Sequence, residues 1–133
     1  MGKFLSGRVS ALGAIFLGLA AMQAVPAALP LLGTLEPGRW ELRDEGNRLI
    51  SSICLGDPAQ LVQIQHAGRN CSRSLISADS RSLTLRYSCP ASGSGRTTIL
   101  VETPRLVQID SQGLFNGAPF ALHVQGRKVG PCS

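Results

Sequence analysis

Alternating apolar and polar residues run through most of the chain after residue 37 and predict a sheet of short strands. The clearest case is residues 82–89, where Leu83, Leu85 and Tyr87 share one face with Cys89. Six further strands are expected at residues 40–43, 49–54, 73–78, 97–103, 105–110 and 120–125. The pattern therefore predicts a mainly β protein with about seven strands.

One segment has the signature of a helix, and it lies between the second and third predicted strands. Asp57 can cap the helix, Pro58 suits its first position, and Gln60 completes a capping-box pattern. Gly68 is expected to end it. Since one helix cannot supply the crossovers of a parallel sheet, we expect a single curved antiparallel sheet that wraps toward a barrel. The helix would cover one opening or face of that sheet.

The first 27 residues resemble an export signal rather than a folded element. Lys3 and Arg8 precede an apolar run of about 11 residues, which is too short to span a membrane, where roughly 20 are needed. Small residues follow, and the pattern predicts cleavage after Ala27. A retained N-terminal membrane anchor is the alternative. Residues 28–36 have no periodicity and are interpreted as a leading segment before a single domain at 37–133.

Four cysteines are expected to form two disulfides, because exported domains with an even number of cysteines usually carry them. Three pairings are possible, and we favour Cys54–Cys71 and Cys89–Cys132. The first pair would flank the predicted helix, and the second would tie the end of the chain to the middle of the domain. Zinc is the competing interpretation, but no C-x-x-C or H-x-x-x-H spacing occurs, so no metal and no cofactor are predicted.

Charge excludes one class of partner. The chain has 13 Lys and Arg against 8 Asp and Glu, a net charge of +5, and Lys3 and Arg8 would leave with the signal. The remaining excess is small and dispersed along the chain. A nucleic-acid-binding protein would instead show a concentrated basic stripe with aromatic residues, so no nucleic-acid partner is expected.

An ordered set of motifs resembles a known bacterial family. The opening Pro37-Gly38-x-Trp40-Glu41, the segment from Cys54 to Gln60, and Cys71 occur in the family's order. Tyr87-Ser-Cys89 and the ending Gly126-x-x-x-Gly130-x-Cys132 continue the match. Together these resemble the secreted family called domain of unknown function 3617, over residues 37–133. Asp-Pro-Ala-Gln stands where that family usually has Pro-Glu-Gln. The resemblance implies a periplasmic or surface location and no activity.

Trp40 and Arg127 are the candidate ligand-binding or packing residues. Gly38-x-Trp40 is similar to the opening of lipocalin-type barrels, in which the Trp closes one end and a late Arg packs on it. Arg127 could supply that cation–π contact. This hypothesis predicts an apolar cavity beside Trp40, while the simpler alternative makes Trp40 an ordinary core residue.

Hydrolytic chemistry has weaker support. His66 and His123 are the only histidines, and both are expected to be exposed, His66 near the end of the helix and His123 on the polar face of its strand. No G-x-S-x-G motif is present. Five acids could in principle pair for glycoside cleavage, although none has apolar neighbours that would raise its pKa: Glu41, Glu45, Asp57, Glu102 and Asp110. No catalytic residue is therefore assigned.

The sequence accordingly predicts a periplasmic or secreted protein of the cell envelope that is not an enzyme and acts as a binding or structural module. A carrier of a small apolar ligand on a lipocalin-like sheet is the alternative, and a small hydrolase is third. We expect a monomer with no retained membrane span. Arginines outnumber lysines ten to one after residue 27. On strand faces they could meet phosphates or other anions, or simply keep the outer face solvated.

Overall fold

The computed structural model describes Gly2 and residues 28–133. The predicted signal peptide and its cleavage after Ala27 lie outside these residues. Two helical segments and seven strands follow one another along the chain, namely α1 (Ala28–Leu32), β1 (Gly38–Arg43), β2 (Leu49–Leu55), η1 (Pro58–His66), β3 (Ser72–Ala78), β4 (Ser82–Cys89), β5 (Gly93–Thr103), β6 (Leu106–Phe115) and β7 (Ala118–Gly130).

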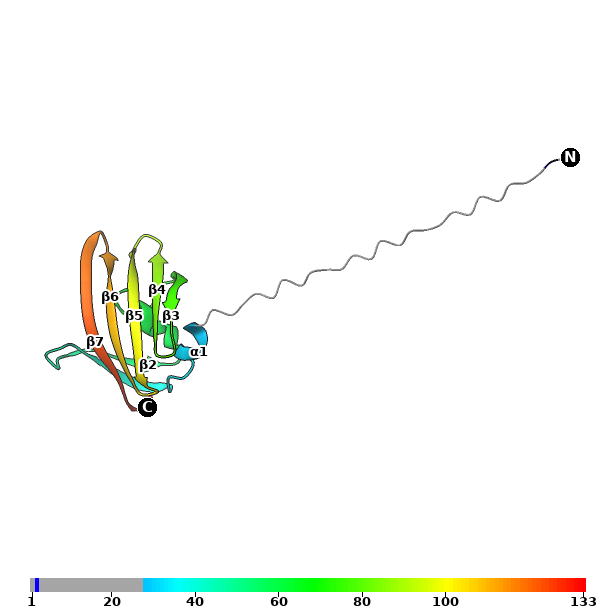
Figure 1. The fold of residues 1–133 in the computed structure, drawn as a ribbon. Coiled ribbons are helices and arrows are strands. Elements are labelled where there is room, and N and C mark those ends of the chain that lie inside the picture. The colour runs from blue at the N-terminus through cyan, green and yellow to red at the C-terminus, as the bar shows by residue number, and fades with distance from the viewer. Residues whose placement is uncertain (1, 3–27) are drawn as a thin grey trace.

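The seven strands form one antiparallel sheet in the order β2-β1-β7-β6-β5-β4-β3. This confirms the predicted mainly β fold and its curved antiparallel sheet. The sheet does not close, because β2 and β3 remain at its two edges. Figure 1 shows β3 to β7 standing side by side while the β1–β2 hairpin turns beneath them. The 3-10 helix η1 follows β2 and precedes β3 along the chain, and it lies inside the curve of the sheet.

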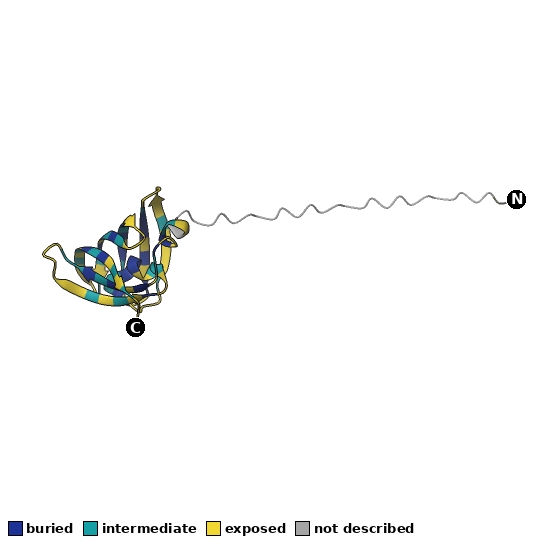
Figure 2. Cartoon of the chain, turned by 90° about the horizontal axis from the view of Figure 1, so that it is seen from below, coloured by how far each residue is buried: buried dark blue, intermediate teal, exposed yellow. Residues whose placement is uncertain are grey.

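The core lies between η1 and the inner face of the sheet, where the buried residues gather in Figure 2. Alternation along each strand supplies it, as the sequence pattern predicts. Leu83, Leu85, Tyr87 and Cys89 are all buried on β4. The Asn116-Gly117 turn joins β6 to β7, and both of its residues have a positive φ, which is the geometry of a tight hairpin turn.

The helix differs in type from the expected one. Asp57 caps it as predicted, with its carboxylate accepting from the Ala59 amide at 2.9 Å, and the Gln60 side chain accepts from the Gly56 amide. The segment nevertheless forms a 3-10 helix that is interrupted at Gln63. Gln63 is 4% exposed. Its side-chain amide points inward and donates hydrogen bonds to two neighbouring backbone carbonyl groups, as described below.

The disulfide pairing favoured from the sequence is wrong. The bonds are Cys54–Cys132 and Cys71–Cys89. Pairing Cys54 with Cys71 across the helix assumed that the two helix ends return to the same place. In the structure η1 carries the chain from one edge strand, β2, to the other, β3. Each cysteine therefore bonds within its own half of the sheet, and the β3–β4 register places Cys71 beside Cys89.

The leading segment is part of the packed structure. Leu32 and Leu35 are buried in the core. Glu36 accepts hydrogen bonds from Arg105 at 2.6 Å and from Lys128 at 3.1 Å, which ties this segment to the β5–β6 turn and to the end of β7. These two bonds lower the pKa of the Glu36 carboxyl group.

Candidate ligand-binding trough

The two residues proposed from the lipocalin-like motif do not meet. Trp40 is fully buried, and its indole N–H donates to the Glu36 carbonyl at 2.9 Å. Arg127 is exposed and lies opposite Glu41, the neighbour of Trp40 on β1. Because adjacent strand residues point to opposite faces of a sheet, Trp40 faces the core and Arg127 faces outward. The predicted cation–π contact is therefore wrong, and Trp40 is an ordinary core residue.

His66 is also not where the sequence suggested. It is 1% exposed rather than solvated. Its Nδ1 lies 2.9 Å from the Tyr87 hydroxyl, and its Nε2 lies 3.2 Å from the Ser92 carbonyl. A carbonyl only accepts, so Nε2 carries a proton and, in the neutral ring, Nδ1 accepts from Tyr87. Burial raises the pKa of the Tyr87 phenol, which keeps that donor protonated. The pair is a satisfied core contact.

His123 is exposed on the polar face of β7, as predicted. Its Nδ1 lies 2.6 Å from the Asp110 carboxylate. This is the orienting half of a hydrolytic triad. Within residues 28–133, however, no serine, threonine or cysteine side chain is hydrogen-bonded to His123. The arrangement therefore offers no activated nucleophile.

An open trough lies between the β1–β2 hairpin and η1. Two hollows of about 380 and 550 Å³ adjoin there and share Ser51 and Ile64 in their walls. Leu42 and Ile53 of the hairpin form the apolar wall of the first hollow, together with Ile64 of η1. The second hollow continues toward β7, and its apolar residues are Ile50, Ile64, Ala121, Leu122 and Val124. Trp40 lines neither. Ile64 thus lies where the two hollows meet, with the half-buried Ile53 and Leu122 nearby in their walls, whereas Leu42 and Val124 are almost fully buried.

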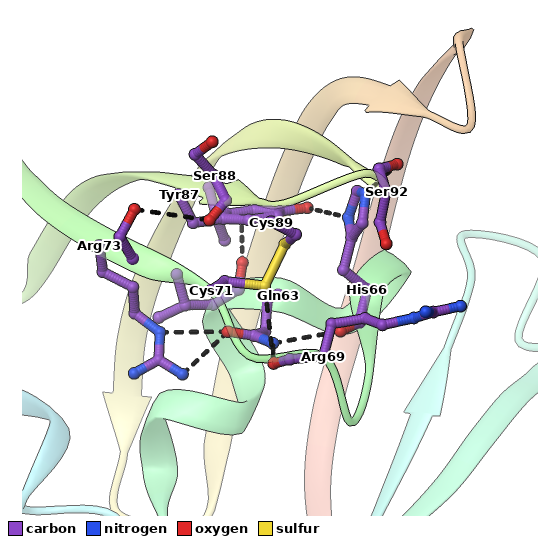
Figure 3. The surroundings of a disulfide bond; sticks show 12 residues. Gln63, His66, Arg69, Cys71, Arg73, Tyr87, Ser88, Cys89 and Ser92 are labelled. Carbon is purple, nitrogen blue, oxygen red and sulfur yellow. Dashed lines mark hydrogen bonds between the residues drawn. A yellow bond between two sulfur atoms is a disulfide. The ribbon is translucent and has the colours of Figure 1, made fainter.

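Gln63 organises one end of this trough (Figure 3). Its side-chain oxygen accepts two hydrogen bonds from the Arg73 guanidinium, at 2.8 and 3.2 Å. Its side-chain nitrogen donates to the carbonyls of His66 and Arg69, at 3.1 and 2.8 Å. The Cys71–Cys89 disulfide anchors the same loop. The guanidinium of Arg73 is therefore held in position before any ligand arrives.

The charge at this end is positive. Arg69 and Arg73 both line the first hollow, and its walls contain no aspartate or glutamate. The side chains of Arg69 and Arg73 point in opposite directions in Figure 3. Only the Arg73 guanidinium is hydrogen-bonded to Gln63, so Arg73 is the cation whose orientation is fixed. The far end is mixed in charge, because Arg48 there pairs with Asp44 at 3.0 Å. An anionic group is accordingly favoured only at the Arg73 end.

Buried hydroxyl groups fasten η1 above the sheet. Thr97 is fully buried and donates to the Val62 carbonyl of η1 at 2.5 Å. Its oxygen also lies 2.7 Å from the Ser111 hydroxyl, which must then be the donor. These bonds hold the helix, and with it Ile64, at a fixed height over the strands. Sequence patterns give no sign of this contact, because Thr97 looks like any other strand threonine.

Metal ligation finds no support in the part of the chain that the structure describes. No three His, Cys, Asp or Glu side chains gather there, and all four cysteines are in disulfides. Gly2 and residues 28–133 also contain no helix long and apolar enough to cross a bilayer.

Comparison with known proteins places no relative beside this chain. No family model, no curated protein and no solved structure matches it. The trough must therefore be interpreted from its own geometry.

Proposed function

We propose that this chain is an exported, non-enzymatic binding module of the cell envelope, and that the trough holds a small amphiphile with an apolar chain and an anionic head. The observation that carries the proposal is the combination of an open apolar floor around Ile64 with a positioned Arg73 at one end. An apolar chain lying on the half-buried side chains of Ile53 and Ile64 would leave water, which favours binding in proportion to the area covered.

Export is supported by two independent features. Both disulfides require an oxidising compartment to persist. The basic and apolar pattern of residues 1–27 is that of a secretory signal. Membership of the domain of unknown function 3617 family is part of the same proposal and rests on the ordered motifs described above. If the proposal is right, secreted protein begins at Ala28, which mass spectrometry of the exported chain would test.

The trough differs from the ligand site expected of a lipocalin-like carrier, which is the alternative hypothesis. Such a carrier encloses its ligand in a barrel closed at one end by the tryptophan. Here Trp40 is packed into the core, and the first hollow lies farther along the same inner face of the hairpin, between Leu42, Ile53 and η1. An apolar ligand therefore fits this protein on an open surface rather than inside the sheet. Exchange with solvent is expected to be fast for that reason.

A fluorescent probe tests the proposal directly. N-phenyl-1-naphthylamine brightens on an apolar surface, and decanoate should displace it. We expect Ile64→Asn to abolish the signal, because this residue lines both hollows. Ile76→Asn is the matched control: Ile76 is 43% exposed on β3 and lines neither hollow, so its variant should behave as wild type. Equal probe binding by the two variants would remove the trough as the site.

The anionic head is tested separately. Decanoate should displace the probe better than decanol, and Arg73→Gln should weaken decanoate by about fivefold, or about 1 kcal/mol for an exposed ion pair. Decanol should be unaffected by the same substitution. If Arg73→Gln weakens both ligands equally, its role is structural and the proposed head-group recognition is wrong.

A further inference from the structure

Two arginines lie directly opposite one another on the outer face of the sheet. They belong to β4 and β5, and neither strand lines the trough. The β4–β5 pairing places Arg86 across from Arg96. Both are exposed, while their strand neighbours Leu85, Tyr87 and Thr97 are buried, so both guanidinium groups face outward. Like charges in this relation destabilise a sheet. The pair therefore has a cost that the fold itself does not explain.

Nothing in the described structure neutralises the pair. Neither Arg86 nor Arg96 forms an ion pair or a side-chain hydrogen bond within residues 28–133. The acid nearest in the register is Asp110, diagonal to Arg96, and its carboxylate is already bonded to His123. Arg43, Arg48 and Arg105 have carboxylate partners, whereas Arg39, Arg69, Arg81 and Arg127 also form no ion pair within residues 28–133, so it is the direct opposition of Arg86 and Arg96 that sets this pair apart. The N–H groups of Arg86 and Arg96 thus face solvent with no acceptor from the described chain.

Hydroxyl groups surround the two arginines. Following the register across the sheet, the row that contains them reads Ser74, Arg86, Arg96, Gln112 and Ala121. The row on one side contains Ser77, Thr84 and Thr98, and the row on the other contains Ser72, Ser88 and Ser94. We call the two arginines with these hydroxyl-bearing neighbours the arginine patch. Thr84 within it is buried and shares a hydrogen bond of 2.8 Å with Thr98, so the serines and Thr98 carry the accessible hydroxyl groups of the patch.

The geometry suits one tetrahedral anion. Directly opposite residues on antiparallel strands have Cβ atoms about 5 Å apart, so two long arginine side chains can converge on a single group. Guanidinium groups recognise phosphate oxygens through paired N–H donors. An open hollow of about 400 Å³ adjoins Arg96 and is lined by Thr98, Gln112 and His123 as well, together with Asp110, whose carboxylate is bonded to His123. These side chains can bond to hydroxyl groups carried beside the anion.

We propose that the arginine patch binds the phosphate group of a phosphorylated carbohydrate. The positive charge of the two arginines would bind the phosphate group. The serine, threonine and glutamine side chains in the neighbouring rows would form hydrogen bonds with the sugar hydroxyl groups. Arg86 and Arg96 lie on the opposite face of the sheet from η1 and line neither hollow of the trough, although the hollow beside Arg96 shares Ala121, Leu122 and His123 with the second trough hollow.

The experiment uses protein that is secreted with both disulfides formed. It is titrated separately with glucose 6-phosphate, inorganic phosphate and glucose. Binding is measured by calorimetry and by changes in amide chemical shifts in NMR spectra. We expect glucose 6-phosphate to bind at least about fivefold more tightly than inorganic phosphate, and glucose alone not to bind. Replacing both arginines, Arg86→Gln with Arg96→Gln, should weaken glucose 6-phosphate by about tenfold or more. Shifts should centre on β4 and β5.

The control is Arg127→Gln, which removes the same charge from the same face at a distance from the patch and should change affinity by less than about twofold. Arg73→Gln, in the trough, should also leave it unchanged, so the two proposed sites can fail separately. Equal binding of inorganic phosphate would overturn the carbohydrate. Binding only to phosphatidylglycerol vesicles would overturn it in favour of a lipid surface. Affinity that survives the double variant, or no binding of any probe, would overturn the patch itself.

Discussion

The disulfide connectivity makes the most decisive test of the fold. Three double variants separate the possible pairings. Cys54→Ser with Cys132→Ser removes one bond, and Cys71→Ser with Cys89→Ser removes the other. Cys54→Ser with Cys71→Ser takes one cysteine from each bond, so the remaining cysteines have lost their partners. We expect no free thiol in the first two variants and two free thiols per molecule in the third.

The sizes of the closed loops set the expected stability losses. The Cys54–Cys132 bond spans 78 residues and the Cys71–Cys89 bond spans 18. In the chain-entropy model these bonds stabilise the fold by about 4.5 and about 3 kcal/mol. A domain of this size has a total unfolding free energy of about 5–15 kcal/mol. Loss of both bonds in the third variant is therefore expected to leave it marginally folded or unfolded.

Urea unfolding followed by the fluorescence of the buried Trp40 measures these losses. The difference of about 1.5 kcal/mol between the first two variants corresponds to roughly 1 M in the urea midpoint. Equal midpoints would refute the loop-entropy reasoning. Absence of free thiols in the third variant would refute the connectivity, since Cys89 and Cys132 would then have paired. Should that variant fail to fold, non-reducing peptide mapping of the wild-type protein still decides which cysteines are joined.

Three further substitutions probe the core and the leading segment. Gly95→Ala would place a methyl group about 2.5 Å from the Tyr87 ring, and we expect a loss of about 2 kcal/mol in urea unfolding; an unchanged midpoint would show that the ring yields. Thr97→Val removes the hydroxyl that holds η1 and should cost about 1–2 kcal/mol, with Ser111→Ala adding less to that variant than to wild type. Hydrogen bonds lower the pKa of Glu36, so its stabilisation is present above its ordinary pKa of 4.5 and is lost as the pH falls through the lowered value. The stability gap between wild type and Glu36→Gln should accordingly close on acidification, and a gap independent of pH would contradict the ion pair.

The strands could be predicted because one face of the sheet is buried. Leu83, Leu85 and Tyr87 alternate with polar residues on β4, and that period is visible without any knowledge of the partners. The start of β5 could not be predicted in this way. The sequence from Pro90 to Gly95 looks like a flexible turn, yet β5 begins at Gly93. Gly95 belongs in the strand because the Tyr87 ring lies against it, and such a contact leaves no periodic signal.

The disulfides and the trough depend on strand order, which local patterns do not contain. Cys54 and Cys71 flank one short helix in the sequence, but they lie on opposite edges of the sheet. Ile64 likewise looks like a core residue of an amphipathic helix. Only the distance between η1 and the β1–β2 hairpin leaves it half-exposed in an open hollow. The outward-facing arginines were visible in the sequence, whereas the direct opposition of Arg86 and Arg96 is a consequence of register.

The helix explains both why the sheet stays open and why a trough exists. Closure would require β2 and β3 to pair at about 4.8 Å, but the nine residues of η1 connect them across the inner face. A 3-10 helix rises about 2 Å per residue, so this connection spans up to about 18 Å and holds the edges apart. Each disulfide then fastens one end of the connection: Cys54 precedes η1 and bonds beyond β7, and Cys71 follows η1 and bonds to β4. The helix fills the middle of the curve without reaching the tip of the β1–β2 hairpin, and the space left there is the trough around Ile64.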